Sequence, residues 1–313
     1  MISRTQEDIL RNWPKEWNSP MVSIRCITYN HEPFIAQALD GFLMQETDFP
    51  FEIVVHDDAS TDKTACIIRE YEKKYNKIIK PIYEVENQYS KHDESISRIM
   101  APFLRGKYIA LCEGDDYWTD PLKLKKQIDF LEKNSNYSAS AHQSILIGKR
   151  SGLFRKHVKS KITINDMVSN SRLFHTASFV YRREQFCSLP KLSKSVLSGD
   201  KLIFLQMSTF GPIFYFDEPM CVYRKHDSGA SLNVCLKEMK MDINIVSYMK
   251  KIYPSFPKYR YLSFLYGTFA LNSKDISKIK KMYYLLGSFL LSFSYFPENL
   301  SKIIGKIKNI YGK

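Results

Sequence analysis

Strand-like and helix-like segments alternate four times between residues 21 and 134 of this 313-residue chain. The strand-like runs are short and apolar, and they cover residues 21–28, 51–57, 80–85 and 107–112. Each run is followed by a helix-like stretch, and in the first of these Phe34, Ala38 and Phe42 recur at helical spacing. This alternation predicts an α/β fold with a mostly parallel central sheet and helices on both of its faces.

The regular alternation ends after Tyr137. Strand-like pieces follow at 138–147, 174–182 and 212–224, with a helix near 200–210, and from residue 232 onward the pattern is helical only. We therefore expect three parts, namely a polar lead-in over 1–20, a domain of strands and helices over 21–231 and a helical region over 232–313. No signal peptide is visible, and the apolar stretch 283–296 is too short for a membrane-spanning helix.

The composition is that of a globular protein, with 44% hydrophobic and 25% charged residues. A net charge of +13 attracts polyanions, which include nucleic acid, anionic membrane surfaces and phosphorylated small molecules. The chain contains no recognised nucleic-acid-binding motif, so we expect no nucleic-acid partner. A basic protein that binds nucleic acid or another anionic surface stays open as an alternative.

Polar residues cluster directly after three of the strand-like runs. The first run ends in Thr28-Tyr29-Asn30, the second continues into residues 57–62, and the fourth continues into residues 113–116. Ligands of parallel α/β sheets bind beyond the carboxyl ends of the strands, where these residues are expected to meet. Crowded carboxylates repel one another unless a cation or hydrogen-bond donors hold them, and Mg²⁺ or Mn²⁺ bound to oxygen ligands fits that need. Taken singly, each acidic cluster is also compatible with a helix cap or a solvated turn.

Three stretches together resemble the family 2 inverting glycosyltransferases: VSIRCITYNHEPFIAQALDGFLMQ, FEIVVHDDASTDKT and GKYIALCEGDDYWTDPLKLKKQIDFL. The resemblance covers residues 21–231 and is strongest over 21–134. It implies a GT-A fold of the nucleotide-diphospho-sugar transferase superfamily, with a Rossmann-like sheet. Residues 21–134 then form the nucleotide-sugar-binding half, and residues 135–231 form the acceptor half.

The resemblance also assigns roles to single residues. Asp115 corresponds to the metal ligand of the family's Asp-x-Asp motif, and His226 lies in a run similar to Tyr-Arg-x-His that supplies a further ligand for Mn²⁺ or Mg²⁺. Glu113 stands where the family has Asp, so we expect it to act through water. The donor site implied by the match comprises Thr28, Tyr29, Asp57, Asp58, Glu113, Gly114, Asp116 and Arg224.

Two residues of the second half are assigned to the acceptor side. Leu197-Ser198-Gly199-Asp200 resembles the family's base motif with Gly199 in place of Glu, which makes Asp200 the general base that deprotonates the acceptor hydroxyl. An N-cap of the following helix is the alternative reading of Asp200. His175, at the start of the strand-like segment 174–182, is assigned a contact with the acceptor, and an ordinary strand residue is the alternative.

The implied activity is transfer from a nucleotide-diphosphate sugar, for which we expect a UDP-sugar, to a saccharide or lipid-linked saccharide in polysaccharide or glycan biosynthesis. Basic residues flank an apolar, aromatic segment within 279–311, which predicts either a helix at an anionic membrane surface or a helix packed on the catalytic domain. The expected location is cytoplasmic, peripheral to the inner face of the cell membrane. A nucleotidyltransferase with the same kind of metal site is the enzymatic alternative.

Overall fold

The computed structural model describes residues 4–91, 95–148, 151–169, 172–226, 234–273 and 275–292. The chain divides into two compact units. The first unit comprises residues 1–163, 172–189 and 206–226, and the second comprises residues 164–171, 190–205 and 227–313. Residues 231 and 232, where the sequence predicts a domain boundary, lie outside the described residues.

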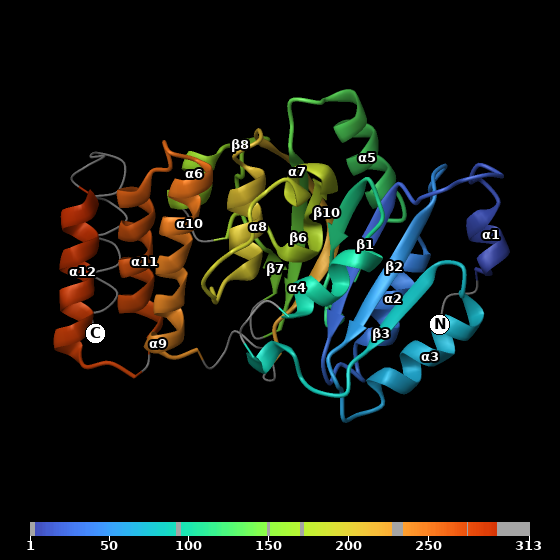
Figure 1. Cartoon of the computed structure of the whole chain (residues 1–313), viewed down its shortest axis with the longest axis horizontal. Helices are drawn as coiled ribbons and strands as arrows, with labels where there is room; N and C mark the ends of the chain where they lie inside the picture. Colours follow the sequence, from blue (N-terminus) through green and yellow to red (C-terminus); the bar gives the residue numbers. More distant parts are fainter. Residues whose placement is uncertain are drawn as a thin grey trace. The chain divides into compact units, whose positions relative to one another are not determined.

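One mixed sheet forms the centre of the first unit (Figure 1). In spatial order its main strands are β3 (Ile79–Tyr83), β2 (Phe51–Asp57), β1 (Val22–Thr28), β4 (Tyr108–Leu111), β9 (Val180–Arg182), β6 (Ala139–Ile147), β10 (Ile213–Arg224) and β5 (Tyr117–Trp118). Two short strands, β7 (Gly152–Leu153) and β8 (Lys161–Ile162), pair with β6 and β10. The four predicted strands β3, β2, β1 and β4 are parallel, whereas β9 runs antiparallel to both of its neighbours. The predicted α/β fold is confirmed.

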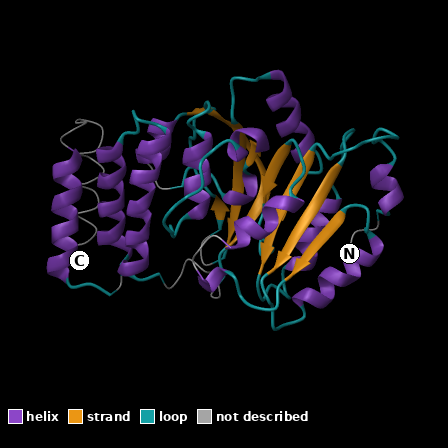
Figure 2. Cartoon of the chain, in the orientation of Figure 1, coloured by secondary structure: helices purple, strands orange, loops and turns teal. Residues whose placement is uncertain are grey.

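Helices cover both faces of this sheet (Figure 2). They include α2 (Ile35–Leu43), α3 (Thr64–Lys74), α4 (Ser95–Met100), α5 (Lys123–Lys133) and the short α7 (Arg183–Cys187). Every residue of β2 is buried, which requires side chains packed above and below that strand. The predicted apolar spacing is confirmed for Ala38 and Phe42 of α2, which are completely buried, whereas Phe34 is the half-buried N-cap of that helix.

The strand predicted over 174–182 is only partly correct. β9 contains Val180–Arg182 alone, and residues Thr176–Ser178 form the short 3₁₀ helix η3. His175 produces this turn, since its carbonyl oxygen accepts the hydroxyl of Ser178 at 2.6 Å and its ring lies at the N-cap. The helix-like stretch after the third strand-like run is likewise divided into α4 and the 3₁₀ helix η2 (Ala101–Phe103).

The polar lead-in packs against the sheet unit. It contains α1 (Gln6–Leu10), which begins with a capping box between Thr5 and Asp8. Trp13 is buried, its indole nitrogen donates to the hydroxyl of Thr47 at 3.0 Å, and its ring meets that of Phe51 edge-on. Burial of a large aromatic side chain of this kind fixes the segment on the unit.

The second unit is helical in the described residues. It includes α6 (Ile164–Ser169), most of α8 (Gly199–Met207), α9 (Leu236–Met239), α10 (Asn244–Ile252), α11 (Lys258–Asn272) and α12 (Lys278–Ser292). This agrees with the helical pattern predicted after residue 232, although residues 293–313 lie outside the described residues. Among the described helices, none combines the length and the apolar character needed to cross a bilayer.

A lysine lies in the core of the first unit. Lys123, at the start of α5, is completely buried, and its ammonium sits 3.9 Å from the ring centroid of Trp118 and donates to Gln127 at 2.7 Å. Burial lowers the pKa of Lys123 from its ordinary value of 10.5 to about 7. Between about pH 7 and 10.5, Lys123 is therefore protonated in the unfolded chain but neutral in the folded protein. The contribution of Lys123 to the free energy of unfolding rises with pH in that range.

We expect Lys123→Met to remove this pH dependence. The difference between the free energies of unfolding of the native chain and the variant should change in favour of the native chain by about 1.4 kcal/mol for each pH unit above pH 7. Urea unfolding of both proteins between pH 6 and pH 9.5 measures the difference. A difference that stays constant over this range would contradict the assignment of a neutral buried lysine.

Candidate active site

The polar segments predicted at the strand ends meet at one edge of the sheet. Thr28, the last residue of β1, is the register partner of Asp57, the last residue of β2. The amide of Asp58 donates to the carbonyl of Thr28 at 2.9 Å, and the amide of Gly114 donates to the carbonyl of Ile27 at 2.9 Å. The segments after β1, β2 and β4 are thus joined by backbone hydrogen bonds, as the strand-end rule predicts.

The two aspartates after β2 have different surroundings. The buried carboxylate of Asp58 accepts the backbone amides of Gln88 at 2.6 Å and Tyr89 at 3.0 Å, which fastens the loop after β3 to this edge. Asp57 is also buried, but within the described residues its Oδ1 has no hydrogen-bond partner, and the same holds for Oγ1 of Thr28. Unused polar atoms of this kind are suited to a ligand or an ordered water.

The glycine between the acidic residues is required by packing. A Cβ on Gly114 would lie 2.9 Å from Cβ of Thr28 and 3.0 Å from Cδ1 of Ile35, which is closer than side chains approach. The turn after β4 therefore passes directly over the end of β1. Tyr29 beside it is 44% exposed, and Asn30 adopts a left-handed conformation with φ 53° that turns the chain toward α2.

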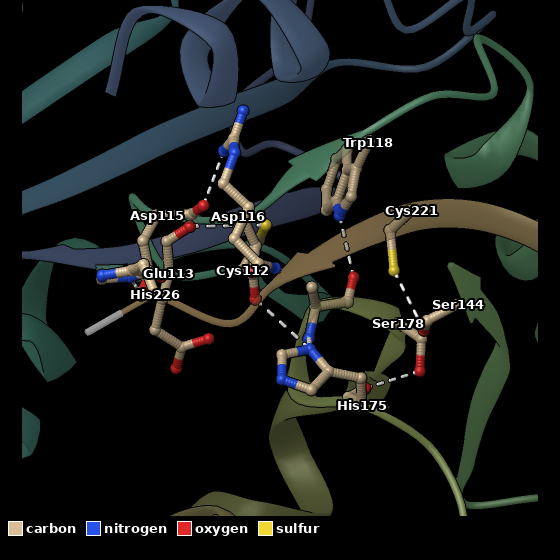
Figure 3. A network of polar contacts seen from close by, with 12 residues as sticks. Cys112, Glu113, Asp115, Asp116, Trp118, Ser144, His175, Ser178, Cys221 and His226 are labelled. Atoms are coloured by element: carbon tan, nitrogen blue, oxygen red, sulfur yellow. Dashed lines mark hydrogen bonds and ion pairs between the residues drawn. The ribbon is translucent and has the colours of Figure 1, made fainter. Parts of the chain in front are cut away.

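Asp115 is faced by two imidazoles. Its Oδ2 lies 3.1 Å from Nε2 of His226, and the two side chains are drawn together in Figure 3. Nε2 of His31 lies 3.9 Å from the same oxygen, and the rings of His31 and His226 are 6.4 Å apart and nearly perpendicular. Burial lowers the pKa of His31, which favours the neutral imidazole. One carboxylate oxygen with two imidazole nitrogens is a donor set that suits a divalent metal ion.

The neighbouring Asp116 points into the protein. Its Oδ1 accepts the backbone amide of Arg224 at 2.8 Å, and its Oδ2 lies 3.3 Å from Nδ1 of His175 (Figure 3). Burial, followed by the nearby charge of Asp115, raises the pKa of Asp116 well above its usual range. Asp116 thus links β10 and η3 to the turn of residues 113–116, here called the acidic turn.

Arg224 is held firmly beside these carboxylates. Its Nη1 donates to the carbonyl of Asp115 at 2.6 Å, and its Nη2 donates to the amide oxygen of Gln37. The guanidinium also lies 5.1 Å from the ring centroid of Phe34 and 4.3 Å from that of Tyr117. A cation fixed by two aromatic faces and two hydrogen bonds is preorganised to attract an anion.

His175 takes a supporting position in this structure. It is buried, and its ring stacks on that of Tyr223 with centroids 3.8 Å apart. Its Nδ1 lies 3.3 Å from Asp116 and 3.4 Å from the amide of Ala177, and a single nitrogen cannot both donate to the first and accept from the second. The carboxylate contact is the shorter one, so we assign Nδ1 to Asp116. The acceptor contact of His175 stays a prediction.

Asp200 belongs to the second unit. It lies in the first turn of α8, and its Oδ1 accepts the backbone amide of Lys201 at 2.7 Å. Asp200 is thus the second residue of α8 and not its N-cap, which corrects the alternative interpretation, whereas the role of general base stays a prediction. Glu113 stays in the acidic turn, where its carbonyl accepts the amide of Asp116 at 3.2 Å.

Sequence reasoning missed two residues of the site, His31 and Gln37. The only sequence signal for His31 is its position directly after Thr28-Tyr29-Asn30. Gln37 carries no signal, because its spacing in α2 is that of an exposed helix residue. Within the described residues, no group of three or more His, Cys, Asp or Glu side chains converges into a complete metal site. Asp115 and His226 approach each other, and His31 lies farther from the same carboxylate oxygen.

Solved structures define the class of this fold. The TarS 1–349 structure from S. aureus in complex with UDP aligns with a TM-score of 0.59 and 19% identity, over 85% of this chain and 78% of that chain. The mannosyltransferase PcManGT from Pyrobaculum calidifontis, in complex with GDP-Man and Mn²⁺, aligns with a TM-score of 0.55 and 16% identity, over 96% and 84% of the two chains. These likenesses establish the GT-A fold.

The sequence comparison gives the family. The profile of Glycosyl transferase family 2 matches residues 23–187, and the chain therefore belongs to this family. The uncharacterized protein Rv1520 of Mycobacterium tuberculosis is 37% identical over 211 residues. That match covers 66% of this chain and 60% of the mycobacterial protein, so the chain spans about three fifths of the length of this relative.

Proposed function

We propose that the chain is an inverting glycosyltransferase that moves a sugar from a nucleotide-diphosphate sugar to a saccharide or lipid-linked saccharide acceptor. The observation that supports this proposal best is the approach of His226 to within 3.1 Å of Asp115 at the carboxyl edge of the sheet. The fixed guanidinium of Arg224 lies beside them. Metal ligands next to a fixed cation are suited to a diphosphate.

A divalent ion, Mn²⁺ or Mg²⁺, fits the residues at this edge. Asp115 and His226 would hold the ion, and His31 would become a third protein ligand after a small movement of its ring. The 3.1 Å between Oδ2 of Asp115 and Nε2 of His226 brings together an oxygen and a nitrogen donor, and a divalent ion accepts both kinds of ligand. When bound, the ion would stabilise negative charge on the diphosphate.

The donor would lie across the ends of β1, β2 and β4. Thr28, Tyr29 and Asp58 are proposed to receive the base, with Asp57, Glu113, Gly114 and Asp116 around the ribose and diphosphate. We expect a UDP-sugar. The TarS structure in complex with UDP supports this choice, whereas the PcManGT structure contains GDP-Man, so the nucleotide has to be determined directly.

The proposed reaction is a single displacement. Asp200 removes the proton of an acceptor hydroxyl while the acceptor oxygen attacks the anomeric carbon. The bond between that carbon and the phosphate oxygen breaks on the opposite face, and the nucleoside diphosphate leaves with the electron pair. Arg224 would stabilise the leaving group, and the anomeric configuration would invert.

A panel of nucleotide sugars tests the proposed function. The chain is incubated with UDP-, GDP- and dTDP-sugars, with Mn²⁺ or with a chelator, and released phosphates are identified by ³¹P NMR. We expect release of a nucleoside diphosphate from one class of donor, and only with the metal. Release of pyrophosphate from a nucleoside triphosphate would instead indicate a nucleotidyltransferase and would overturn the proposal.

We expect His31→Ala to weaken Mn²⁺ binding by about tenfold or more, because the ion would lose an imidazole ligand. Electron paramagnetic resonance of free Mn²⁺, titrated in the presence of UDP, measures this affinity without any sugar transfer. His157→Ala is a matched control, since His157 is an exposed histidine that lies 126 residues after His31 in the sequence. Equal affinities of the native chain and His31→Ala would exclude His31 as a ligand.

A further inference from the structure

The outer face of α12 is a continuous apolar stripe. Its exposed side chains follow one another at intervals of one, three or four residues, which places them on one side of a helix. They are Ile279 (83% exposed), Met282 (41%), Tyr283 (67%), Leu286 (54%) and Leu290 (66%). Single exposed apolar residues are normal in soluble proteins, but a contiguous exposed stripe of this kind marks an interaction surface.

The stripe is not needed to fold the hairpin formed by α11 and α12. The opposite side of α12 packs on α11, where the hydroxyl of Ser263 donates to the carbonyl of Ser288 at 2.8 Å. Tyr284 and Leu285 are buried there, and the ring of Tyr284 meets that of Tyr266 edge-on at 5.7 Å. α12 is therefore apolar on two sides, and among the described residues packing on α11 buries only one of them.

The charged residues of α12 are all basic. α12 carries Lys278, Lys280 and Lys281 and contains no Asp or Glu. The following sequence, residues 293–313, adds Lys302, Lys306, Lys308 and Lys313 against a single acid, Glu298. Tyrosine and aliphatic side chains bordered by lysines are the composition of helices that lie in the interface of an anionic bilayer.

We propose that the outer face of α12 docks on an anionic membrane. The helix lies in the plane of the interface, with Tyr283, Leu286 and Leu290 at the boundary between headgroups and acyl chains and with the lysines at lipid phosphates. Two other partners for this face are a second copy of the chain and residues 293–313. A second copy would bring two sets of lysines together, and residues 293–313 would add four lysines to the three of α12. Both partners place like charges side by side, whereas anionic lipids neutralise the lysines.

Vesicle co-sedimentation of the full chain tests this proposal, and it requires no sugar donor. We expect binding to vesicles of phosphatidylcholine mixed with phosphatidylglycerol, little binding to phosphatidylcholine alone, and weaker binding as salt is raised. Tyr283→Ser combined with Leu286→Ser should lower the partition coefficient by about tenfold or more. The matched control is Val85→Ser with Leu153→Ser, which removes two other exposed apolar side chains and should leave binding unchanged.

A pair of charge variants distinguishes the effect of the lysines of α12 on vesicle binding from the effect of the net charge of the chain. Lys278→Glu with Lys280→Glu should lower binding by about tenfold or more, whereas Lys73→Glu with Lys77→Glu on the exposed surface of the first unit should have a smaller effect. Each double variant replaces two lysines by two glutamates, so both variants lower the net charge of the chain by the same amount. An equal loss in both variants would contradict a specific role for α12.

Three other outcomes would overturn the proposal. Equal binding to both kinds of vesicle would remove the anionic partner. A dimer in light scattering that Tyr283→Ser with Leu286→Ser dissociates would assign the stripe to a second copy. A lowered unfolding temperature of that variant with unchanged vesicle binding would assign the stripe to packing within the chain. None of these results bears on sugar transfer, so the proposed function is tested separately.

Discussion

Asp200→Asn is expected to lower the rate of sugar transfer by about 10²- to 10⁴-fold, which is the usual contribution of a positioned general base. The amide cannot accept the proton of the acceptor hydroxyl, so the loss should appear in kcat with the acceptor saturating. The dissociation constant of the donor should stay unchanged, because the proposed base has no part in holding the nucleotide. Steady-state kinetics together with calorimetric titration of the donor separates the two quantities.

The control for this variant has to exclude a purely structural role, since Asp200 lies in the first turn of α8. Asp129→Asn makes the same change on the exposed side of α5, where Asp129 pairs with Lys125 at the surface, and should leave kcat unchanged. The unfolding temperature of Asp200→Asn should fall only slightly, because the variant loses the favourable interaction of a carboxylate with the N-terminal end of the α8 dipole. Normal turnover of this variant would refute the assignment of the base.

Gly106→Ala is expected to destabilise the first unit by about 3 kcal/mol or more, at the upper end of the range for overpacked positions. A Cβ at this position would lie 2.3 Å from the backbone nitrogen of Ser23 and 2.7 Å from the carbonyl carbon of Val22. The amide of Gly106 also donates to the hydroxyl of Ser23 at 2.7 Å. Backbone atoms of β1 cannot move aside without breaking its pairing with β4.

Urea unfolding compares Gly106→Ala with Gly199→Ala. A Cβ on Gly199 meets nothing within 4 Å, and alanine favours the helical conformation at that position in α8, so this control should keep or slightly raise stability. The contrast depends only on the space around each glycine. If both variants unfolded at the same urea concentration as the native chain, the close approach of Gly106 to β1 would be wrong.

The parts of the fold that were predictable depend on local pattern. The strands β1, β2, β3 and β4 are short apolar runs between amphipathic helices, and this order alone specifies parallel neighbours. The insertion of β9 between β4 and β6 was not predictable. Its three residues, Val180–Arg182, follow a turn in which the hydroxyl of Ser178 donates to the carbonyl of His175, and no periodicity in the sequence indicates such a contact.

The same distinction applies to the site. The placement of Asp57, Asp58 and Asp115 at one edge was predictable because they lie at or after the ends of neighbouring strands, and their roles stay predictions. His31 was missed because its approach to Asp115 depends on how the turn after β1 folds toward the turn after β4, and a lone histidine carries no such signal. The burial of Asp116 was equally hidden, since it results from contacts with β10 and η3 that are distant in the sequence.

The central claim is that the acidic edge of the sheet holds a divalent ion that grips a diphosphate. Calorimetric titration of UDP into the native chain and into Asp115→Ala, each with and without Mn²⁺, tests it most directly. We expect Mn²⁺ to tighten UDP binding to the native chain by about tenfold or more, and we expect this coupling to be lost in Asp115→Ala. UDP binding to the native chain that does not depend on Mn²⁺, or coupling that survives in the variant, would contradict a diphosphate-binding ion at Asp115.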